Sequence, residues 1–247
     1  MSAVTNGFAF FFMNGIMNED KDGSTTTDVI QSIIKEEPIF KVGKAFVVFH
    51  YNDAAPTERV IQEVALGIGG AIATGYSIDK EVKKKGDAVS RSIGFAGACA
   101  IFGAVYDYKN MQEDKNRIAS SLAGRVSKFL EEDKSNIANL ILHSQGADVG
   151  YRTLEILEKY KDRIRVVTLG AMTTIPNGMC DRVVNYKFTN DWVSRVVAIP
   201  FEIVRQSMDD RERVITDLSR EELTNHHDVH EYLKEPVVRT YIRNLLS

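Results

Sequence analysis

Short apolar runs recur along the chain and predict the strands of a sheet. Each run holds about four to six residues, mostly Val, Ile, Leu or Phe, without polar alternation. Such runs are typical of buried parallel strands, because both faces of those strands are covered. The predicted strands are Phe8–Met13, Ala45–Phe49, Ile137–Leu142, Val166–Leu169, Val183–Phe188 and, with a weaker pattern, Arg213–Asp217.

Segments with helical spacing lie between these runs. In the best of them apolar residues recur at steps of three and four, which gathers them on one stripe and leaves charged residues opposite. Pro236 separates two late helical segments. Strands that alternate with helices predict a single α/β domain over residues 1–247, with three α/β/α layers and a mostly parallel central sheet. The predicted helices are Met111–Asp133, Gly146–Lys159, Thr224–Leu233 and Val237–Leu246.

The segment between Val64 and Tyr106 departs from this alternation. It is rich in Gly, Ala and Ile, and its small residues recur four apart, which lets two helices approach closely. We expect a tightly packed helical hairpin, a cap or insertion over 64–106 that covers the sheet or the site. The alternative is a cap that touches a membrane or binds an acyl chain, since each apolar stretch is too short or too polar for a secure membrane span.

The composition argues against a nucleic-acid partner and for a reducing cellular compartment. The chain carries 31 Lys and Arg against 34 Asp and Glu, a net charge of −3, whereas a nucleic-acid partner needs a basic surface. Cys99 and Cys180 are too few for a disulfide framework and indicate free thiols in a reducing compartment. No basic residue precedes the apolar run Phe8–Met13, so we expect no signal peptide and a cytoplasmic location. Peripheral membrane contact through 64–106 stays open.

The most informative motif joins a predicted strand to a predicted helix. Residues 140–147 read Leu-Ile-Leu-His-Ser-Gln-Gly-Ala. A serine on such a tight turn, here Ser144, holds its hydroxyl clear of the backbone, and the next amide, that of Gln145, points toward a substrate oxygen. Gly146 lets the start of the helix pack close to a neighbouring strand. The motif resembles the nucleophile elbow of the α/β-hydrolase superfamily, in its lipase and esterase branch.

One position departs from the family pattern Gly-x-Ser-x-Gly. Leu142 stands where the family has its first glycine, and we expect its side chain to crowd the turn. We therefore keep a second interpretation, a catalytically inactive hydrolase-like scaffold that binds lipid or a protein partner, because a fold alone does not establish activity.

The resemblance implies an acid and then a histidine later in the chain. Asp191 follows a predicted strand, at the edge where open α/β sheets gather their sites; the alternative for Asp191 is a turn or helix-capping role. We expect His227 as the base, because lipase-like members often carry a tyrosine five positions later, here Tyr232. His226 and His230 are the second and third candidates. Zinc held by His226 and His230 lacks a carboxylate-rich companion motif, so we expect neither a metal nor a cofactor.

An oxyanion hole is also implied by the resemblance. Its expected donors are the amide of Gln145 and the amide of Gly15 or Ile16, in the turn after the first predicted strand. The residues expected at the substrate site are Asn14, His143 and Met172.

Together these residues predict a serine hydrolase that cleaves an ester or a thioester through an acyl-enzyme. Ser144 is the expected nucleophile, His227 the base and Asp191 the residue that orients the base. The expected substrate is a small-molecule ester, a thioester or a lipid, and acyl transfer to an acceptor other than water is a third interpretation. The chain as a whole is similar to hydrolase-like proteins of bacteria.

Overall fold

The computed structural model describes residues 7–14, 20–41, 45–50, 115–191, 193–197, 211–219 and 227–247. By its internal contacts the chain divides into two units, one formed by Met1–Asp53 with Lys115–Ser247 and the other by Ala54–Asp114. All described residues belong to the first unit. The expected cap over 64–106 lies outside the described residues, so it stays a prediction.

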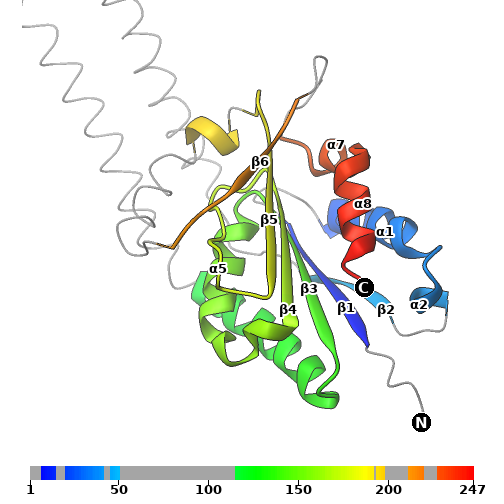
Figure 1. Ribbon diagram of the computed structural model, residues 1–247. Helices are drawn as coiled ribbons and strands as arrows, with labels where there is room; N and C mark the ends of the chain where they lie inside the picture. Colours follow the sequence, from blue (N-terminus) through cyan, green and yellow to red (C-terminus); the bar gives the residue numbers. More distant parts are fainter. Residues whose placement is uncertain are drawn as a thin grey trace, which may run out of the picture. The chain divides into compact units, whose positions relative to one another are not determined.

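Parallel strands form one sheet at the centre of the first unit (Figure 1). The sheet has six strands in the order β2-β1-β3-β4-β5-β6, and every neighbouring pair runs parallel. Each apolar run is confirmed as a strand, although the last strand is shifted from the predicted bounds. The strands are β1 (Phe8–Met13), β2 (Ala45–His50), β3 (Ile137–His143), β4 (Ile164–Leu169), β5 (Arg182–Phe188) and β6 (Ile215–Leu218).

Helices cover both faces of this sheet, which confirms the predicted α/β fold (Figure 1). On one face lie α1 (Asp20–Ile34), α7 (Val229–Lys234) and α8 (Pro236–Asn244). On the other face lie α5 (Gly146–Ile156) and the helical residues 115–132. The short helix α2 (Pro38–Lys41) contacts β2. Neither α1 nor α2 was among the predicted helices.

The predicted helix Gly146–Lys159 is shorter than expected. Helix α5 ends at Ile156, and a 3-10 turn, η1 (Glu158–Arg163), leads from it toward β4. Pro236 occupies the first turn of α8, where its missing N–H needs no partner, so the predicted break between the last two helices is confirmed.

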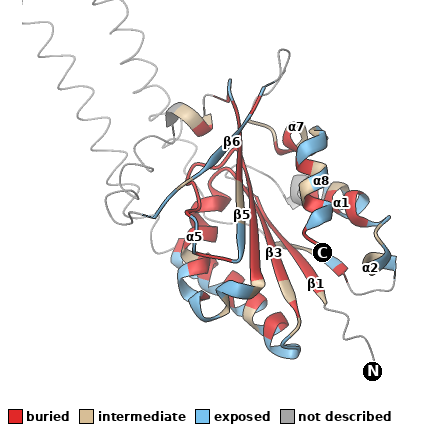
Figure 2. Cartoon of the chain, in the orientation of Figure 1, coloured by how far each residue is buried: buried red, intermediate tan, exposed pale blue. Residues whose placement is uncertain are grey.

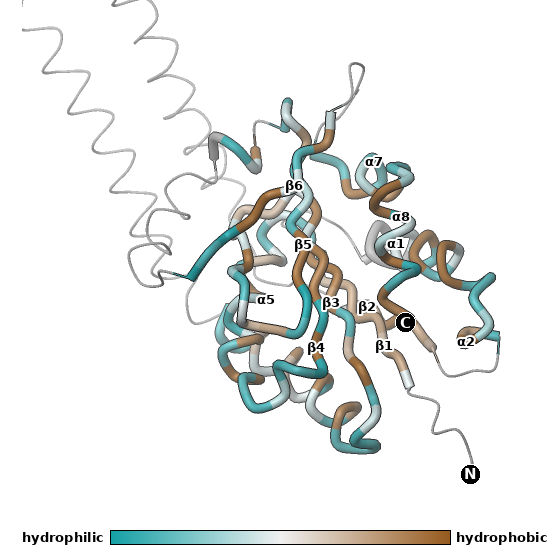
Figure 3. Tube along the Cα trace, viewed as in Figure 1, coloured by the Kyte–Doolittle hydropathy of each residue, from teal (hydrophilic) through white to brown (hydrophobic). Residues whose placement is uncertain are grey.

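Alternate residues of the central strands enter different layers of the core. Phe8, Phe10 and Phe12 of β1 pack with the apolar faces of α1, α7 and α8. Phe11, which points to the opposite face, lies edge-on against Phe129 of the helical residues 115–132, with ring centroids 6.3 Å apart. Figures 2 and 3 show the result: the central strands are buried and largely apolar, and exposed polar residues lie on the outer sides of the helices. Both faces of β1 are therefore fixed by packing, which fixes the register of its neighbours.

The order of the strands reverses between β1 and β3. From β1 the chain moves to β2 on one side, and it later returns to β3 on the other side of β1. In open α/β sheets, ligands bind at such a reversal, outside the carboxyl ends of the strands. Asn14 follows β1 and Ser144 follows β3, so the topology brings both residues to this edge.

Candidate active site

Ser144 occupies the tight turn between β3 and α5. Its φ is +53°, and among the described residues no other non-glycine residue has a positive φ. Its N–H donates to the carbonyl oxygen of Leu169, the last residue of β4, over 3.2 Å, which ties the turn to the neighbouring strand. A left-handed backbone at a residue with a side chain costs about 1–3 kcal/mol and concentrates at functional sites. The strained turn is the conformation expected of a nucleophile elbow.

A glycine allows α5 to begin against the end of β1. A Cβ atom on Gly146 would lie 2.5 Å from the carbonyl oxygen of Asn14 and 2.7 Å from that of Met13. These separations leave no room for a side chain. The start of α5 and the residue that follows β1 are therefore packed directly against one another, as the candidate oxyanion site requires. Asn14 itself is fully buried.

Leu142, the departure from the family pattern, is accommodated by a second glycine. The leucine is fully buried, and a Cβ atom on Gly150 of α5 would overlap its Cδ1 atom. The Leu142 side chain thus occupies the space next to Gly150, which has no side chain of its own. Gly150 lies one helical turn after Gly146 in α5. The expected crowding of the turn is relieved by this packing.

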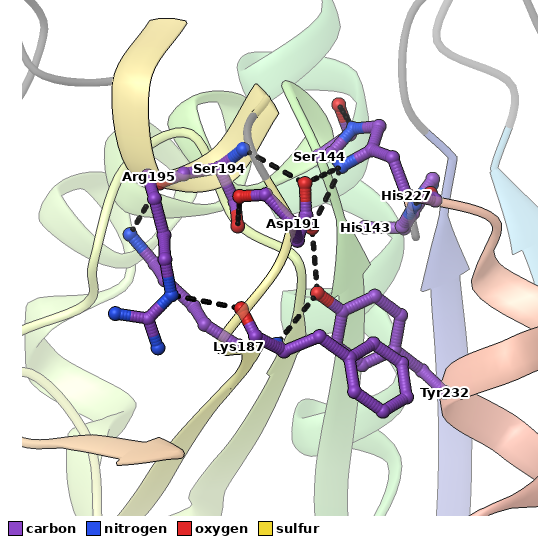
Figure 4. Close-up of polar contacts among 9 residues, drawn as sticks. His143, Ser144, Lys187, Asp191, Ser194, Arg195, His227 and Tyr232 are labelled. Carbon is purple, nitrogen blue, oxygen red and sulfur yellow. Dashed lines mark hydrogen bonds and ion pairs between the residues drawn. The ribbon is translucent and has the colours of Figure 1, made fainter. Parts of the chain in front are cut away.

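His227 links the serine to the aspartate (Figure 4). Its Nε2 atom lies 2.7 Å from Ser144 Oγ, and its Nδ1 atom lies 2.9 Å from Asp191 Oδ2 and 3.1 Å from Asp191 Oδ1. A carboxylate only accepts hydrogen bonds, so Nδ1 of His227 carries a proton and donates it to Asp191, while Nε2 faces the serine hydroxyl. Asp228 caps α7 by accepting the N–H of His230, which holds His227 just outside the helix.

Asp191 is fully buried, and its carboxylate accepts hydrogen bonds from several donors. Besides His227, the N–H of Ser194 donates to Oδ1 over 3.1 Å, and the hydroxyl of Tyr232 donates to Oδ2 over 2.6 Å. Burial acts to raise the pKa of Asp191, but the hydrogen bond and charge of His227, with the bonds from Tyr232 and Ser194, hold this pKa below its ordinary value. Asp191 therefore stays ionised, and it also caps the turn that follows it, as its alternative interpretation expected.

His143 is buried and lies beside His227. The two imidazole rings have centroids 5.1 Å apart, and His143 Nε2 lies 2.8 Å from the carbonyl oxygen of His227. Because a carbonyl oxygen only accepts, Nε2 of His143 is the donor. Burial, followed by the charge of His227, lowers the pKa of His143 to about 3. His143 is thus a neutral donor to the backbone carbonyl of His227, and its expected contact with substrate stays a prediction.

The structure brings together the three residues that the sequence singled out as a triad, namely Ser144, Asp191 and His227. Met172 lies next to them, since its N–H donates to the carbonyl oxygen of Ser144 over 3.1 Å. Gln145 is the N-cap residue of α5, and its side chain is buried. Gly15, Ile16 and His226 lie outside the described residues.

Sequence reasoning found only part of the roles of four residues that shape this site. It pointed to Tyr232 only through its spacing from His227, and to Gly170 only as a position of close packing beside the serine. It assigned no role to Ser194 or Gly150. The pattern Asp-x-x-Ser at 191–194 is a signal for a capped turn that could have found Ser194. A glycine directly after a strand is the corresponding signal for Gly170.

Three other features of the described residues bear on function: a free thiol, possible metal ligands and possible membrane-spanning helices. Cys180 is a free, buried thiol, and burial raises its pKa to about 12, so it is a poor nucleophile. The described ranges contain no group of three or more His, Cys, Asp or Glu side chains arranged to hold a metal ion. Among helices in the described part of the chain, none combines the length and apolarity needed to cross a bilayer. Cys99 lies outside the described residues.

Comparisons of the chain with protein-family models, with curated proteins and with solved structures find no match. The interpretation of the site therefore depends on its geometry.

Proposed function

We propose that the protein is a serine hydrolase of the lipase and esterase type that cleaves an ester or a thioester. One observation carries the proposal: His227 Nε2 lies 2.7 Å from the hydroxyl of Ser144, a residue held at a φ of +53° on a strand-to-helix turn. A strained serine, a histidine within hydrogen-bond distance and a buried aspartate behind it are the parts that activate a hydroxyl as a nucleophile.

In the proposed reaction Ser144 Oγ attacks the carbonyl carbon of the substrate while its proton passes to His227 Nε2. The imidazolium that forms is stabilised by Asp191, and it then gives the same proton to the departing alcohol or thiol. The products of this half-reaction are an acyl-Ser144 ester and the free leaving group. Water attacks the acyl-enzyme with His227 again as the base, which releases the carboxylic acid and restores the serine.

The charge that develops on the substrate oxygen needs donors in place. The first amide of the elbow, that of Gln145, is the proposed donor on one side, and the positive end of the α5 dipole favours negative charge there. The proposed second donor is the amide of Gly15 or Ile16, which follow Asn14 in the chain and lie outside the described residues. The tight packing of Gly146 against the carbonyl of Asn14 supports this assignment, because it places the two segments next to each other.

The packing of Leu142 over Gly150 favours a working elbow over the inactive scaffold. The scaffold interpretation rested on two features, the unusual segment 64–106, which lies outside the described residues, and a leucine that was expected to crowd the turn. With Gly150 making room for that leucine, Ser144 keeps its distance of 2.7 Å to the base.

The test combines turnover with covalent labelling. The protein is assayed on p-nitrophenyl esters and acyl thioesters of increasing chain length, and is then treated with a fluorophosphonate probe whose site is mapped by mass spectrometry. We expect turnover of at least one substrate and labelling of Ser144. Ser144→Ala and His227→Ala should each lower kcat/KM by roughly 10⁴- to 10⁶-fold, the scale seen when a triad member is removed.

A matched control removes another serine hydroxyl. Ser32→Ala changes an exposed residue of α1 whose hydroxyl bonds only within its own helix, and it should leave both rate and labelling unchanged. Labelling that persists in Ser144→Ala, or a folded wild type that neither turns over any ester nor reacts with the probe, would contradict the proposal and favour the binding scaffold.

A further inference from the structure

The hydroxyl of Tyr232 lies directly behind the carboxylate of Asp191, in a place that the proposed mechanism does not use (Figure 4). It is 2.6 Å from Asp191 Oδ2 and 3.1 Å from the backbone nitrogen of Phe188, the last residue of β5. We propose that Tyr232 is a positioning residue that keeps the carboxylate of Asp191 turned toward His227. The inference rests on the proposed function, because it concerns the orienting residue of that triad.

The direction of both hydrogen bonds is fixed by chemistry. The N–H of Phe188 can only donate, so the tyrosine oxygen accepts from it, and the single hydroxyl proton is left for Asp191 Oδ2. Burial, followed by the charge of Asp191, raises the pKa of Tyr232, which keeps the hydroxyl protonated at any pH at which the protein would work. Tyr232 therefore acts as a permanent donor to the carboxylate.

This donor determines how the carboxylate is turned. His227 Nδ1 lies at similar distances from the two oxygens, 2.9 Å from Oδ2 and 3.1 Å from Oδ1, so the histidine alone does not choose between them. Ser194 N–H holds Oδ1 from one side and the Tyr232 hydroxyl holds Oδ2 from the other. With both oxygens held, the plane of the carboxylate is fixed and the imidazole follows it.

Tyr232 also connects the elements that carry the acid and the base. It belongs to α7, which begins two residues after His227, and its ring packs on Phe188 with centroids 4.4 Å apart. Asp191 comes three residues after Phe188. The fully buried side chain of Tyr232 thus joins α7 to the end of β5. In this way it sets the distance between Asp191 and His227.

The space for this contact is reserved by a glycine. A Cβ atom on Gly170 would lie 2.9 Å from Asp191 Oδ2 and 3.0 Å from the Tyr232 hydroxyl. A residue with a side chain at 170 would displace one of the two partners. The carboxylate, the hydroxyl and the empty position of Gly170 therefore form one arrangement.

A double-mutant cycle tests the inference on the full-length protein. Tyr232→Phe should lower kcat by about 10- to 100-fold, the effect of losing a hydrogen bond to a charged group, and should leave KM within about twofold. In an Asp191→Asn background the same change should have almost no further effect, because the charge that the hydroxyl serves is gone. Tyr241→Phe, which removes a hydroxyl from α8 near Tyr186, is the matched control and should leave kcat unchanged.

A second readout does not depend on turnover. With ¹³C-labelled aspartate, NMR titration should show that Tyr232→Phe raises the pKa of Asp191, because a donor to the charged form is lost. If the wild type has no activity, the proposed function fails, and this titration still decides whether Tyr232 controls the carboxylate. Should Tyr232→Phe fail to fold, 3-fluorotyrosine at 232 keeps both bonds with a more acidic hydroxyl and should lower the pKa of Asp191 further. An unchanged Asp191 pKa, or an equal loss of kcat in the Asp191→Asn background, would overturn the inference.

Discussion

Two neighbouring strands, β3 and β4, are each followed by a turn residue with nearly the same φ angle. Ser144 follows β3 with a φ of +53°, and Gly170 follows β4 with a φ of +56°. In each turn the N–H continues the sheet: Ser144 donates to Leu169 over 3.2 Å, and Gly170 donates to Tyr186 over 2.9 Å. One turn carries a side chain in a conformation that L-residues avoid, while the other carries none.

The difference shows where the fold accepts strain. At Gly170 the space of a side chain is occupied by Asp191 and Tyr232, and glycine adopts a positive φ without penalty. At Ser144 a hydroxyl 2.7 Å from His227 accompanies the strained backbone. The fold therefore carries a backbone cost at the position of the proposed nucleophile and avoids it where only the turn is needed.

The largest effect should come from making the two turns alike. Ser144→Gly removes the hydroxyl and relieves the backbone, so we expect kcat/KM to fall by roughly 10⁴-fold or more while the free energy of unfolding rises by about 1 kcal/mol. Ester hydrolysis and urea unfolding measure the two quantities. A variant that is less stable than the wild type would show that the serine backbone is not strained.

The converse exchange should damage the fold. Gly170→Ala adds both an unfavourable φ and a contact of 2.9 Å with Asp191 Oδ2, so we expect a loss of roughly 2–4 kcal/mol in unfolding free energy. Gly178→Ala is the control, because Gly178 has a φ of +86° with open space around its Cβ position, and it should lose only the backbone part, about 1–2 kcal/mol. Equal losses in both variants would mean that the space beside Asp191 does not matter.

The two turns also differ in the element that comes next, because the serine turn leads into α5, which packs over β3. Gly150→Ala should cost about 2 kcal/mol, because its Cβ would overlap Leu142. In a Leu142→Ala background the same change should be neutral or stabilising, as alanine favours a helix more than glycine does. Urea unfolding of the four proteins in this cycle gives the coupling, and a cost that is independent of residue 142 would refute the exchange of side-chain space between the two positions.

The residues just before the two turns should give a smaller effect, a difference in how stability depends on pH. His143 pairs in register with Leu169, yet only His143 can bind protons. Its pKa falls from 6.5 in the unfolded chain to about 3 in the folded protein, so between these values the unfolded chain binds more protons and stability falls as the pH falls.

Between pH 7 and pH 5 this proton uptake should cost up to about 2 kcal/mol of unfolding free energy, at about 1.4 kcal/mol per pH unit below 6.5. His143→Gln keeps a neutral donor for the carbonyl of His227 and removes the titration, so its stability should vary less over this range by that amount. The same pH dependence in both proteins would show that His143 is not held neutral by the fold.

Much of the fold could be predicted because burial leaves a strong pattern in the sequence. The strands at the centre of the sheet, such as β1 and β3, are apolar on both faces and appear as continuous runs. Strand β6 was predicted less accurately, because it is an edge strand with only Leu218 buried. Helix α1 was missed because its first half is polar and rich in Thr, a poor helix former. Its buried residues Ile30, Ile33 and Ile34 belong to the core, so tertiary packing rather than local propensity stabilises this helix.

The site follows the same division. Ser144, Asp191 and His227 could be picked out because each follows a strand or precedes a helix in a recognisable order. The contacts that Tyr232 and Gly170 make with Asp191 could not be predicted, because they join distant parts of the chain: Tyr232 bonds to a residue 41 positions away. The orientation of His143 toward His227 depends on tertiary structure in the same way, since the two are 84 positions apart.

If Ser144 is the nucleophile, it becomes acylated during turnover, and the acyl-enzyme can be trapped. The protein is mixed with an activated ester, quenched in acid within milliseconds to seconds, and digested for mass spectrometry. We expect the mass of the acyl group on the peptide that contains Ser144. In Ser144→Gly this acylated peptide should be absent, and in His227→Ala it should form much more slowly. Turnover of the ester with the acyl group on another residue, or with no acylated residue at all, would contradict the proposed mechanism.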